Sequence, residues 1–360
     1  MPVPAKTSKN FELIISLKII EKKASLTRDI TGRTAPVLGN KIFLPLYLPE
    51  LTYINKNFKT IFKNIEYIKL NFCYNLISRE KNMKGIILAA GYGTRFLPIT
   101  KTIPKEMLPI LNKPAIDYII QEFIDSGIKD ILLINSRRKK VLEDYFDREI
   151  ELENIFLKEN KKNELEKIKN KKINISFIRQ KEMLGTGNAL LYAKPWINRE
   201  PVIVAYPDDL HIGNPPLSLQ LIKLYEKTGK NIISIMENPE NINRYGVIDL
   251  YKDEIHVKNI VEKPKIGSEP SNKASIGRFL YNYEFFEHLE EGFKLHQRGE
   301  YYHIYALKKL MDQKKVLYKN IKGKRIDIGT LEGYLEAIIN FAKKDKNLME
   351  IIKKGINEND

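Results

Sequence analysis

The most constraining feature of this sequence is a strand-like apolar run that opens onto two closely spaced glycines and then onto two cations. The run covers residues 84–90, the glycines are Gly91 and Gly93, and the cations are Arg95 and Lys105. Glycine has no Cβ, so backbone N–H groups of the loop can approach phosphate oxygens closely. Arginine adds a planar fork of donors, and lysine adds a mobile charge. The pattern predicts a phosphate site at the carboxyl end of a buried strand.

Two other interpretations of this loop compete with a phosphate site. The dinucleotide fingerprint G-x-G-x-x-G needs a third glycine where this chain has Phe96, and prolines at 98, 104 and 109 oppose a helix directly behind the loop. Hydride transfer is therefore disfavoured. A glycine turn with incidental basic residues is the purely structural alternative, and the loop alone is compatible with it.

The composition suits a globular protein with a sizeable core. The chain has 360 residues, 43% of them hydrophobic, which allows two domains or one large one. No apolar run approaches the roughly 18 residues of a membrane span, and the amino terminus lacks a secretion-signal layout. We therefore expect a cytoplasmic protein with no membrane partner. The single cysteine, Cys73, allows no internal disulfide, in keeping with a reducing compartment.

The net charge of +16 is distributed unevenly along the chain. Residues 1–82 contain 14 Lys and Arg against 6 Asp and Glu, and the remaining 278 residues contain 47 against 39. Half of the excess therefore falls in less than a quarter of the chain. Elsewhere the lysines are interspersed with glutamates, as on a solvated surface, and no basic motif with interleaved aromatic residues stands out. A nucleic-acid partner is not expected.

The first part of the chain, residues 1–82, shows no clear helical or alternating period. We expect Met83 to be the native start, so that the preceding stretch is either an upstream translation assigned by mistake or a poorly ordered extension. A genuine add-on for interaction is the alternative.

From Met83 onward, strand-like and helix-like segments alternate, which predicts one α/β domain over residues 83–345 and a tail at 346–360. The expected sheet is mixed but mainly parallel and is flanked by helices, with ligands at the carboxyl ends of its strands. A charge-rich stretch at 151–172 is expected to be a solvated helical excursion. Further strands are expected at 130–135, 173–179, 202–205, 232–236, 247–250 and 316–321, and helices at 114–126, 138–146, 187–194, 216–227, 283–291 and 330–343.

Three aspartates stand where strand-like segments end. Asp208 and Asp209 follow the apolar run at 202–205, and Asp327 precedes a glycine and an expected helix. Carboxylates can hold Mg²⁺, a hard ion that prefers oxygen ligands and keeps several waters. An aspartate at such a position can also be only a helix cap or a turn former. Together with the glycine loop, these residues favour a metal site.

Two further groups of residues have the side chains that could bind a nucleobase and a sugar phosphate. A glutamine amide offers one donor and one acceptor, which complements a uracil edge, and Gln180 lies shortly before Gly185 in a glycine-containing loop. Glu262 could accept hydrogen bonds from sugar hydroxyls, and Lys263 could neutralise a sugar phosphate. The structural alternatives are a surface position for Gln180 and a surface ion pair for the other two.

The run G-Y-G-T-R-F-L-P-I-T-K-T-I-P-K-E-M-L-P-I-L-N-K-P at 91–114 resembles the signature of the sugar-phosphate nucleotidyltransferases. Glu106 favours the uridylyltransferase branch of that family over the thymidylyltransferase branch, which usually has glutamine there. Further matches continue to about Ala342. The resemblance therefore covers nearly everything after Met83 and has no counterpart for residues 1–82.

The resemblance implies a Rossmann-like nucleotidyltransferase fold and the reaction of UTP with α-D-glucose 1-phosphate to give UDP-glucose and pyrophosphate, with Mg²⁺ as cofactor. It implies catalytic roles for Arg95, Lys105 and Asp208. It also implies metal binding by Asp208 with Asp327, and support at most from Asp209. The family forms dimers or tetramers, so a homo-oligomer is expected. The other implied contacts are with the nucleotide, at Ala89, Ala90, Gly91, Gly93, Thr94, Glu106, Gln180 and Gly185, and with the sugar phosphate, at Gly246, Glu262, Lys263 and Gly277.

One segment departs from the family pattern. Where relatives usually read G-E-I-Q-L-T-D, this chain has G-E-Y-Y-H-I-Y at 299–305, so Glu300 remains but the glutamine and the aspartate are replaced. Because that segment helps to shape the sugar pocket in the family, the hexose stays open. The pyrimidine also stays open, since one methyl group is worth only about 1–3 kcal/mol in a pocket. The alternatives are a thymidylyltransferase that uses dTTP, another sugar-1-phosphate nucleotidyltransferase, and a non-catalytic regulatory relative that binds nucleotide sugars.

Overall fold

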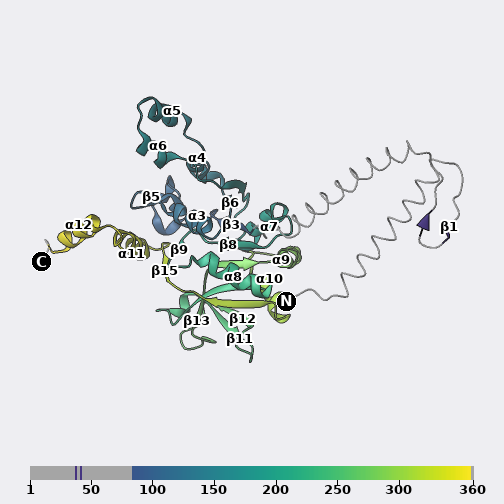
Figure 1. Ribbon diagram of the computed structural model, residues 1–360. Helices are drawn as coiled ribbons and strands as arrows, with labels where there is room; N and C mark the ends of the chain where they lie inside the picture. The colour runs from purple at the N-terminus through teal and green to yellow at the C-terminus, as the bar shows by residue number, and fades with distance from the viewer. Residues whose placement is uncertain (1–36, 39–40, 43–82, 358–360) are drawn as a thin grey trace, which may run out of the picture. The chain divides into compact units, whose positions relative to one another are not determined.

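The computed structural model describes residues 37–38, 41–42 and 83–357 (Figure 1). The strands β1 (Val37–Leu38) and β2 (Lys41–Ile42) pair antiparallel and belong to a unit of residues 1–80, which is distinct from the unit of residues 81–360. The expectation that residues 1–82 are an extension falls almost wholly outside the described residues. All the elements from β3 onward belong to the second unit.

The second unit is built on a nine-stranded mixed sheet, as expected from the alternation of strands and helices. Its first half is parallel: β3 (Lys84–Leu88) lies between β6 (Asp130–Asn135) and β8 (Val202–Ala205), and β7 (Asn174–Arg179) pairs with β6. Next to β8, the strand β13 (Lys273–Tyr281) runs antiparallel. The other strands are β10 (Asn231–Glu237), β11 (Gly246–Leu250), β12 (Val257–Glu262) and β14 (Val316–Asn320).

Helices cover both faces of this sheet, and alternate strand residues bury into two separate cores. In β3, Ile86 packs into one hydrophobic cluster and Ile87 into the other, as the two-residue period of a strand requires. The first cluster includes α7 (Thr186–Ile197), α9 (Tyr283–Leu295) and α10 (Ile304–Asp312). The second cluster includes α3 (Ala115–Asp125), α4 (Val141–Phe146), α8 (Leu217–Thr228) and α11 (Leu331–Ala342).

No α-helix begins directly behind the glycine loop, in agreement with the three prolines of that segment. The chain instead makes three short 3-10 turns before α3 starts at Ala115. These turns are η1 (Thr94–Phe96), η2 (Ile99–Lys101) and η3 (Lys105–Met107). A small hairpin, β4 (Pro109–Ile110) with β5 (Lys113–Pro114), follows them.

The sequence interpretation missed the nine-residue strand β13. Its interior contains Gly277 and Arg278, two residues that are unusual inside a buried strand. The structure accommodates Arg278 because Glu122 on α3 pairs with it. The tail expected at 346–360 contains a further helix, α12 (Lys346–Asn357).

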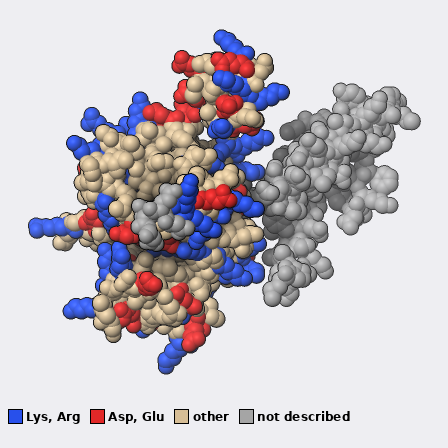
Figure 2. Space-filling view, turned by 90° about the vertical axis from the view of Figure 1, so that its left-hand side faces the viewer, with Lys and Arg blue, Asp and Glu red and all other residues tan. Residues whose placement is uncertain are grey.

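The charge-rich excursion after α4 is helical and solvated, as expected. It consists of α5 (Ile150–Lys158) and α6 (Lys162–Ile168), and neither helix contains a buried residue. Over the face shown in Figure 2, Lys and Arg side chains are interspersed with Asp and Glu. Within the described part of the chain, no helix is both long and apolar enough to cross a membrane.

Candidate active site

The glycine loop leaves the sheet at the carboxyl end of β3, next to the end of β8. Gly93 adopts a left-handed conformation with φ +70°, which a residue with a side chain rarely adopts, and its carbonyl accepts a hydrogen bond from Thr100 Oγ1 at 2.9 Å. The space where Gly91 would carry a Cβ is open, with no atom within 4 Å. The predicted anion loop is therefore an exposed turn at the edge where parallel strands end.

Two carboxylates are held near this loop by a small second sheet: Asp327 is the last residue of one strand, and Asp208 directly precedes the other. Strand β9 (Asp209–Ile212) pairs antiparallel with β15 (Lys324–Asp327), and Ile328 N donates to the carbonyl of Asp208 at 2.9 Å. A Cβ placed on Gly329 would lie 2.9 Å from Asp208 Oδ2 and 2.9 Å from Asp327 Oδ1. These two oxygens are therefore at most twice that distance, 5.8 Å, apart.

The same glycine also brings in the arginine of the loop. The Cβ position of Gly329 lies 3.1 Å from Arg95 Nη1, which donates to the Gly329 carbonyl at 3.2 Å. Arg95, Asp208 and Asp327, which are distant in sequence, thus converge on one point. A side chain at position 329 would fill the space that they share.

Lys105 joins this group through Asp208. Its Nζ lies 2.5 Å from Asp208 Oδ2, and both side chains are mostly buried. Burial lowers the pKa of Lys105, but the negative charges of Asp208 and Glu106 outweigh that effect and raise it. Burial likewise favours the protonated form of Asp208, yet the Lys105 charge holds its pKa below the ordinary value. Both groups are therefore charged at neutral pH.

Asp209 differs from Asp208 in facing inward. It is 4% exposed; its Oδ2 accepts a hydrogen bond from Gly277 N at 2.6 Å, and its Oδ1 lies 3.1 Å from Arg325 Nε. Burial raises the pKa of Asp209 in spite of the nearby Arg325 and Arg278 charges. Asp209 thus holds β9 to β13 and β15, a supporting position that leaves its neighbour Asp208 to face the loop.

The residues present fit a magnesium ion held jointly with substrate. No group of three or more His, Cys, Asp or Glu side chains among the described residues could hold a metal by itself. Mg²⁺ does not need such a cage, because it commonly binds one or two carboxylates, substrate phosphates and waters. Asp208 and Asp327 supply the two carboxylates. Lys105 and Arg325 are their cationic partners in the structure.

Glu106, which is expected to contact the nucleotide, is enclosed by protein groups in this structure. Its side chain is 1% exposed, and both carboxylate oxygens accept hydrogen bonds from Lys139 Nζ at 2.8 Å. This pairing braces the turn η3, to which Glu106 belongs. Lys139 lies in the turn η4 (Arg137–Lys139) directly after β6 and was not singled out from the sequence. The R-R-K-K run behind that strand was the signal that could have identified it.

The residues on either side of the two glycines differ in how far their side chains are buried. Ala89 is completely buried and its N–H donates to the Ile134 carbonyl at 2.8 Å, so it extends the β3 to β6 pairing beyond the strand. Ala90 is also buried, and Thr94 is exposed. Of these three residues, only Thr94 presents its side chain to solvent beside the loop.

The candidate base loop is tied to the segment that departs from the family pattern. Gly187 N donates to the Tyr301 carbonyl at 2.8 Å, and Tyr301 N donates to the Leu184 carbonyl at 2.6 Å. Gly185 has φ +93°, and a Cβ there would lie 2.6 Å from the Tyr301 carbonyl oxygen. Residues 184–187 therefore need glycine at two positions because another backbone segment passes directly beside them.

Gln180 lies next to this loop but is not the surface residue of the structural alternative. It is 5% exposed, and its Nε2 donates to Asn188 Oδ1 at 3.0 Å and to the Gly185 carbonyl at 3.3 Å. The donor that we expected to meet a uracil edge is therefore engaged with protein groups. Gln180 holds the loop and Asn188 in place in this structure.

The sugar-side residues meet across the hairpin of β11 and β12. Gly246 is directly opposite Glu262, and a Cβ on Gly246 would lie 2.8 Å from Glu262 Oε1. Lys263 follows in a left-handed conformation with φ +45°, and its N–H donates to the Tyr245 carbonyl at 3.0 Å. Gly277 is in β13, where its N–H binds Asp209.

Tyr206, in the turn between β8 and β9, is held next to β13, because its N–H donates to the Gly277 carbonyl at 2.9 Å. Burial raises the pKa of its hydroxyl, a hydrogen bond with Thr186 lowers it, and the charges of Glu262, Asp208 and Asp209 raise it further. Its hydroxyl lies 3.3 Å from His303 Nδ1, which is also 3.2 Å from Thr186 Oγ1. Burial lowers the pKa of His303 to about 4, so its imidazole is neutral at pH 7. Tyr206 was not singled out from the sequence, whereas His303 lies in the 299–305 segment that departs from the family pattern.

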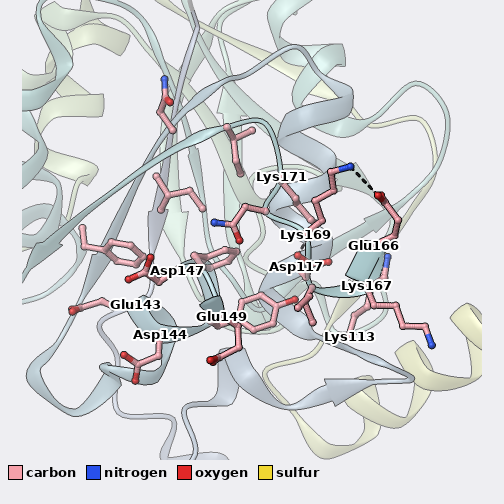
Figure 3. Close-up of a pocket in the computed structure, with 18 of the residues that line it drawn as sticks. Lys113, Asp117, Glu143, Asp144, Asp147, Glu149, Glu166, Lys167, Lys169 and Lys171 are labelled. Carbon is pink, nitrogen blue, oxygen red and sulfur yellow. Dashed lines mark hydrogen bonds and ion pairs between the residues drawn. The ribbon is translucent and has the colours of Figure 1, made fainter. Parts of the chain in front are cut away.

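A large cavity among the described residues is in a different place. It has a volume of about 1380 Å³ and lies between α4, α6 and the edge strand β7. Figure 3 shows acidic side chains such as Glu143 and Asp144 on one side of it and lysines such as Lys169 and Lys171 on the other. None of the site residues expected from the sequence lines this cavity, so its size does not mark the candidate active site.

Comparison with known proteins identifies close relatives. The nucleotidyl transferase family matches residues 84–344. UTP–glucose-1-phosphate uridylyltransferase from Bacillus subtilis is 42% identical over 277 residues, which cover 75% of this chain and 94% of that protein. UTP–glucose-1-phosphate uridylyltransferase 1 from Staphylococcus saprophyticus is 40% identical over 283 residues, 76% of this chain and 98% of that protein. The crystal structure of a UDP-glucose pyrophosphorylase in complex with UDP-glucose is similar with a TM-score of 0.62 and 39% identity, covering 73% of this chain and 99% of that one.

Proposed function

This chain belongs to the nucleotidyl transferase family, and we propose that it transfers the uridylyl group of UTP to α-D-glucose 1-phosphate and releases pyrophosphate. The relatives named above carry this activity in their names, and the chain covers nearly their whole length. The observation that carries the proposal for this chain is the convergence of Arg95, Asp208 and Asp327 on Gly329. That point combines cationic and carboxylate groups at the end of parallel strands.

In the proposed reaction, a phosphate oxygen of glucose 1-phosphate attacks the α-phosphorus of UTP. The new bond forms as the bond from the α-phosphorus to the β-phosphate oxygen breaks, and pyrophosphate leaves with the electron pair. The attacking oxygen is already ionised, so the protein needs no general base. Its task is to bring two anions together and to stabilise charge in the transition state.

The cations of the site are suited to this task. Arg95 can donate hydrogen bonds to the β- and γ-phosphates, and Lys105 can neutralise negative charge on the α-phosphate as the bond breaks. Because Lys105 is paired with Asp208 in the structure, its ammonium group is held at the loop before any phosphate arrives. Preorganised charge of this kind costs no rearrangement during the reaction.

We assign the metal to Asp208 and Asp327. Mg²⁺, when bound, offsets negative charge on the phosphates and aligns the nucleotide for attack. The two carboxylates come from β15 and the segment before β9, so the pairing of those strands fixes their separation. Asp327 Oδ1 also accepts a hydrogen bond from Gly329 N at 2.9 Å, which orients it toward the shared space.

Recognition of the two substrates is assigned to separate surfaces. The loop at 184–187, braced by Gln180, would hold the base. The ribose and phosphates would contact Ala89, Ala90, Gly91, Gly93 and Thr94. Glu262 would accept hydrogen bonds from glucose hydroxyls, with Gly246 leaving room beside it. Lys263 would neutralise the sugar phosphate, and Gly277 would support that side through Asp209.

A substrate panel tests the function directly. The purified chain would be incubated with UTP, dTTP or another nucleoside triphosphate and with glucose 1-phosphate or another sugar 1-phosphate, with pyrophosphate release as the readout. We expect the largest kcat/KM with UTP and glucose 1-phosphate. A preference for dTTP would identify the thymidylyltransferase alternative, and nucleotide-sugar binding without turnover would identify a regulatory relative.

A homo-oligomeric state and a cytoplasmic setting complete the proposal. The family habit of forming dimers or tetramers supports the first, and the single cysteine supports the second. Light scattering on the purified chain measures the oligomer directly. A mass equal to one chain would contradict that part of the proposal and leave the reaction unaffected.

A further inference from the structure

Arg325 bridges three elements of the site and has no role in the reaction as described so far. Its Nε lies 3.1 Å from Asp209 Oδ1, its Nη2 lies 3.2 Å from Asp327 Oδ2, and its Nη1 donates to the Tyr245 hydroxyl at 3.0 Å. The guanidinium also lies over the Tyr245 ring, 5.2 Å from its centre. All three nitrogens of the guanidinium group are therefore engaged.

This arrangement depends on the shape of the guanidinium group. Its nitrogens lie in one plane and point in fixed directions, so one side chain can hold two carboxylates and a hydroxyl at defined angles. A lysine ammonium could neutralise one carboxylate but could not reach all three partners together. The side chain of Arg325 is only 11% exposed, so the ion pairs are shielded from solvent.

The three partners belong to different parts of the site. Asp327 faces the space shared with Asp208, and Asp209 anchors β9 to Gly277. Tyr245 precedes Gly246 on the sugar side, and its carbonyl accepts a hydrogen bond from Lys263 N. Arg325 is thus a direct physical connection between the proposed metal carboxylate and the proposed sugar-phosphate loop.

We propose that Arg325 is a positioning residue that orients Asp327 for the metal-bound nucleotide and ties that carboxylate to the sugar-phosphate loop through Tyr245. The inference rests on the proposed function. It assigns Arg325 no contact with substrate. A substitution at Arg325 should therefore alter the Mg²⁺ dependence of nucleotide binding. A substitution at Tyr245 should alter both that dependence and the binding of glucose 1-phosphate.

The test measures UTP binding to the purified full chain by calorimetry at a series of Mg²⁺ concentrations, without sugar phosphate and without turnover. Replacing a group that orients a metal ligand commonly costs about 10- to 100-fold in metal affinity or activity. We therefore expect Arg325→Lys to raise the half-saturating Mg²⁺ concentration by about tenfold or more. An unchanged Mg²⁺ dependence in a folded Arg325→Lys protein would overturn the proposal.

Two further variants separate positioning from general stability. Lys324→Gln changes the preceding residue of the same strand, an exposed lysine paired with Glu336, and should leave the Mg²⁺ dependence unchanged. Tyr245→Phe removes only the hydroxyl and should raise the KM for glucose 1-phosphate and the half-saturating Mg²⁺ concentration together. If Arg325→Lys does not fold, an unchanged Mg²⁺ dependence in Tyr245→Phe overturns the proposal instead.

The wild-type chain distinguishes failure of this inference from failure of the proposed function. If the wild type shows Mg²⁺-dependent pyrophosphate release from UTP while the Arg325 variant binds UTP with the same Mg²⁺ dependence, only the inference fails. If the wild type releases no pyrophosphate with any substrate pair, the proposed function itself fails.

Discussion

Lys105 Nζ and Asp208 Oδ2 lie 2.5 Å apart, although they come from separate segments of the chain. This contact holds a cation of the glycine loop against the carboxylate that follows β8. Each group stabilises the charged form of the other, as the raised pKa of Lys105 and the lowered pKa of Asp208 indicate. The protein therefore holds both charges in place before substrate binds.

Loss of either partner should reduce turnover strongly. We expect Lys105→Met and Asp208→Asn each to lower kcat by about 100- to 1,000-fold, because each removes charge that stabilises the transition state. Pyrophosphate release under saturating substrate measures this effect. Lys113→Met, at an exposed lysine that lines the large cavity, is the matched control and should keep full activity. Near-normal turnover in both site variants would contradict the assignment.

Chelation should remove activity without unfolding the protein. Because the proposed site has only Asp208 and Asp327 as protein ligands, we expect the metal to bind together with the nucleotide and to exchange readily. Excess chelator should therefore abolish pyrophosphate release, and added Mg²⁺ should restore it. Full turnover in chelator would refute the metal assignment. Circular dichroism in chelator provides the control for folding.

A side chain at position 246 should affect the sugar substrate selectively. In Gly246→Ala, the new Cβ would lie 2.8 Å from Glu262 Oε1, so the carboxylate must move. We expect the KM for glucose 1-phosphate to rise while the affinity for UTP stays close to that of the wild type. Steady-state kinetics with each substrate varied in turn separates the two effects. An equal rise in both constants would place Glu262 outside the sugar site.

A side chain at position 185 should instead affect the nucleotide. Gly185 combines φ +93° with a Cβ position 2.6 Å from the Tyr301 carbonyl oxygen, so Gly185→Ala strains the loop for two reasons. We expect weaker UTP binding, measured by calorimetry. Gly91→Ala is a useful comparison, because the space at that position is open and any effect would come from the ligand alone. Unaltered UTP affinity in Gly185→Ala would argue against a base-binding role for this loop.

The buried pair of Glu122 and Arg278 should make stability depend on acid pH. Glu122 Oε2 lies 2.9 Å from Arg278 Nη2, and its Oε1 lies 3.0 Å from Arg278 Nε. Burial raises the pKa of Glu122, but the Arg278 charge and the hydrogen bonds from Arg278 and Ser218 outweigh this effect. The pKa of Glu122 therefore lies below its ordinary value of 4.5. The folded protein thus binds a proton at Glu122 less readily than the unfolded chain does. This contribution to stability is complete above pH 4.5 and is lost as the pH falls below it.

Urea unfolding at several pH values tests this pair. We expect Glu122→Gln to lower the free energy of unfolding at neutral pH by about 3 to 5 kcal/mol, because Arg278 stays buried without its counter-charge. The variant should also lose less stability than the wild type on acidification. An equal acid-induced loss in both proteins would show that another group is responsible.

Much of the fold could be predicted from local sequence patterns. The positions of β3, β6, β8 and α3 follow from apolar runs and periodicity, since their side chains pack against one sheet. The strand β13 could not be found in this way, because Gly277 and Arg278 interrupt its apolar pattern. Arg278 is tolerated there because Glu122, on a helix far away in sequence, pairs with it, and because its guanidinium also donates to the Gly277 and Asp209 carbonyls.

The chemical character of the site can be read from local sequence: a glycine loop with Arg95 and Lys105, and aspartates placed where strands end. Which of these groups meet depends on how distant segments pack in the fold. Pairing of β9 with β15 brings Asp327 to Asp208 and places Arg325 between Asp327 and Asp209. Separately, the approach of η4 to η3 encloses Glu106 against Lys139. Each side chain is given by the sequence and local backbone conformation depends largely on neighbouring residues, whereas ion pairs and burial depend on segments that only folding brings together.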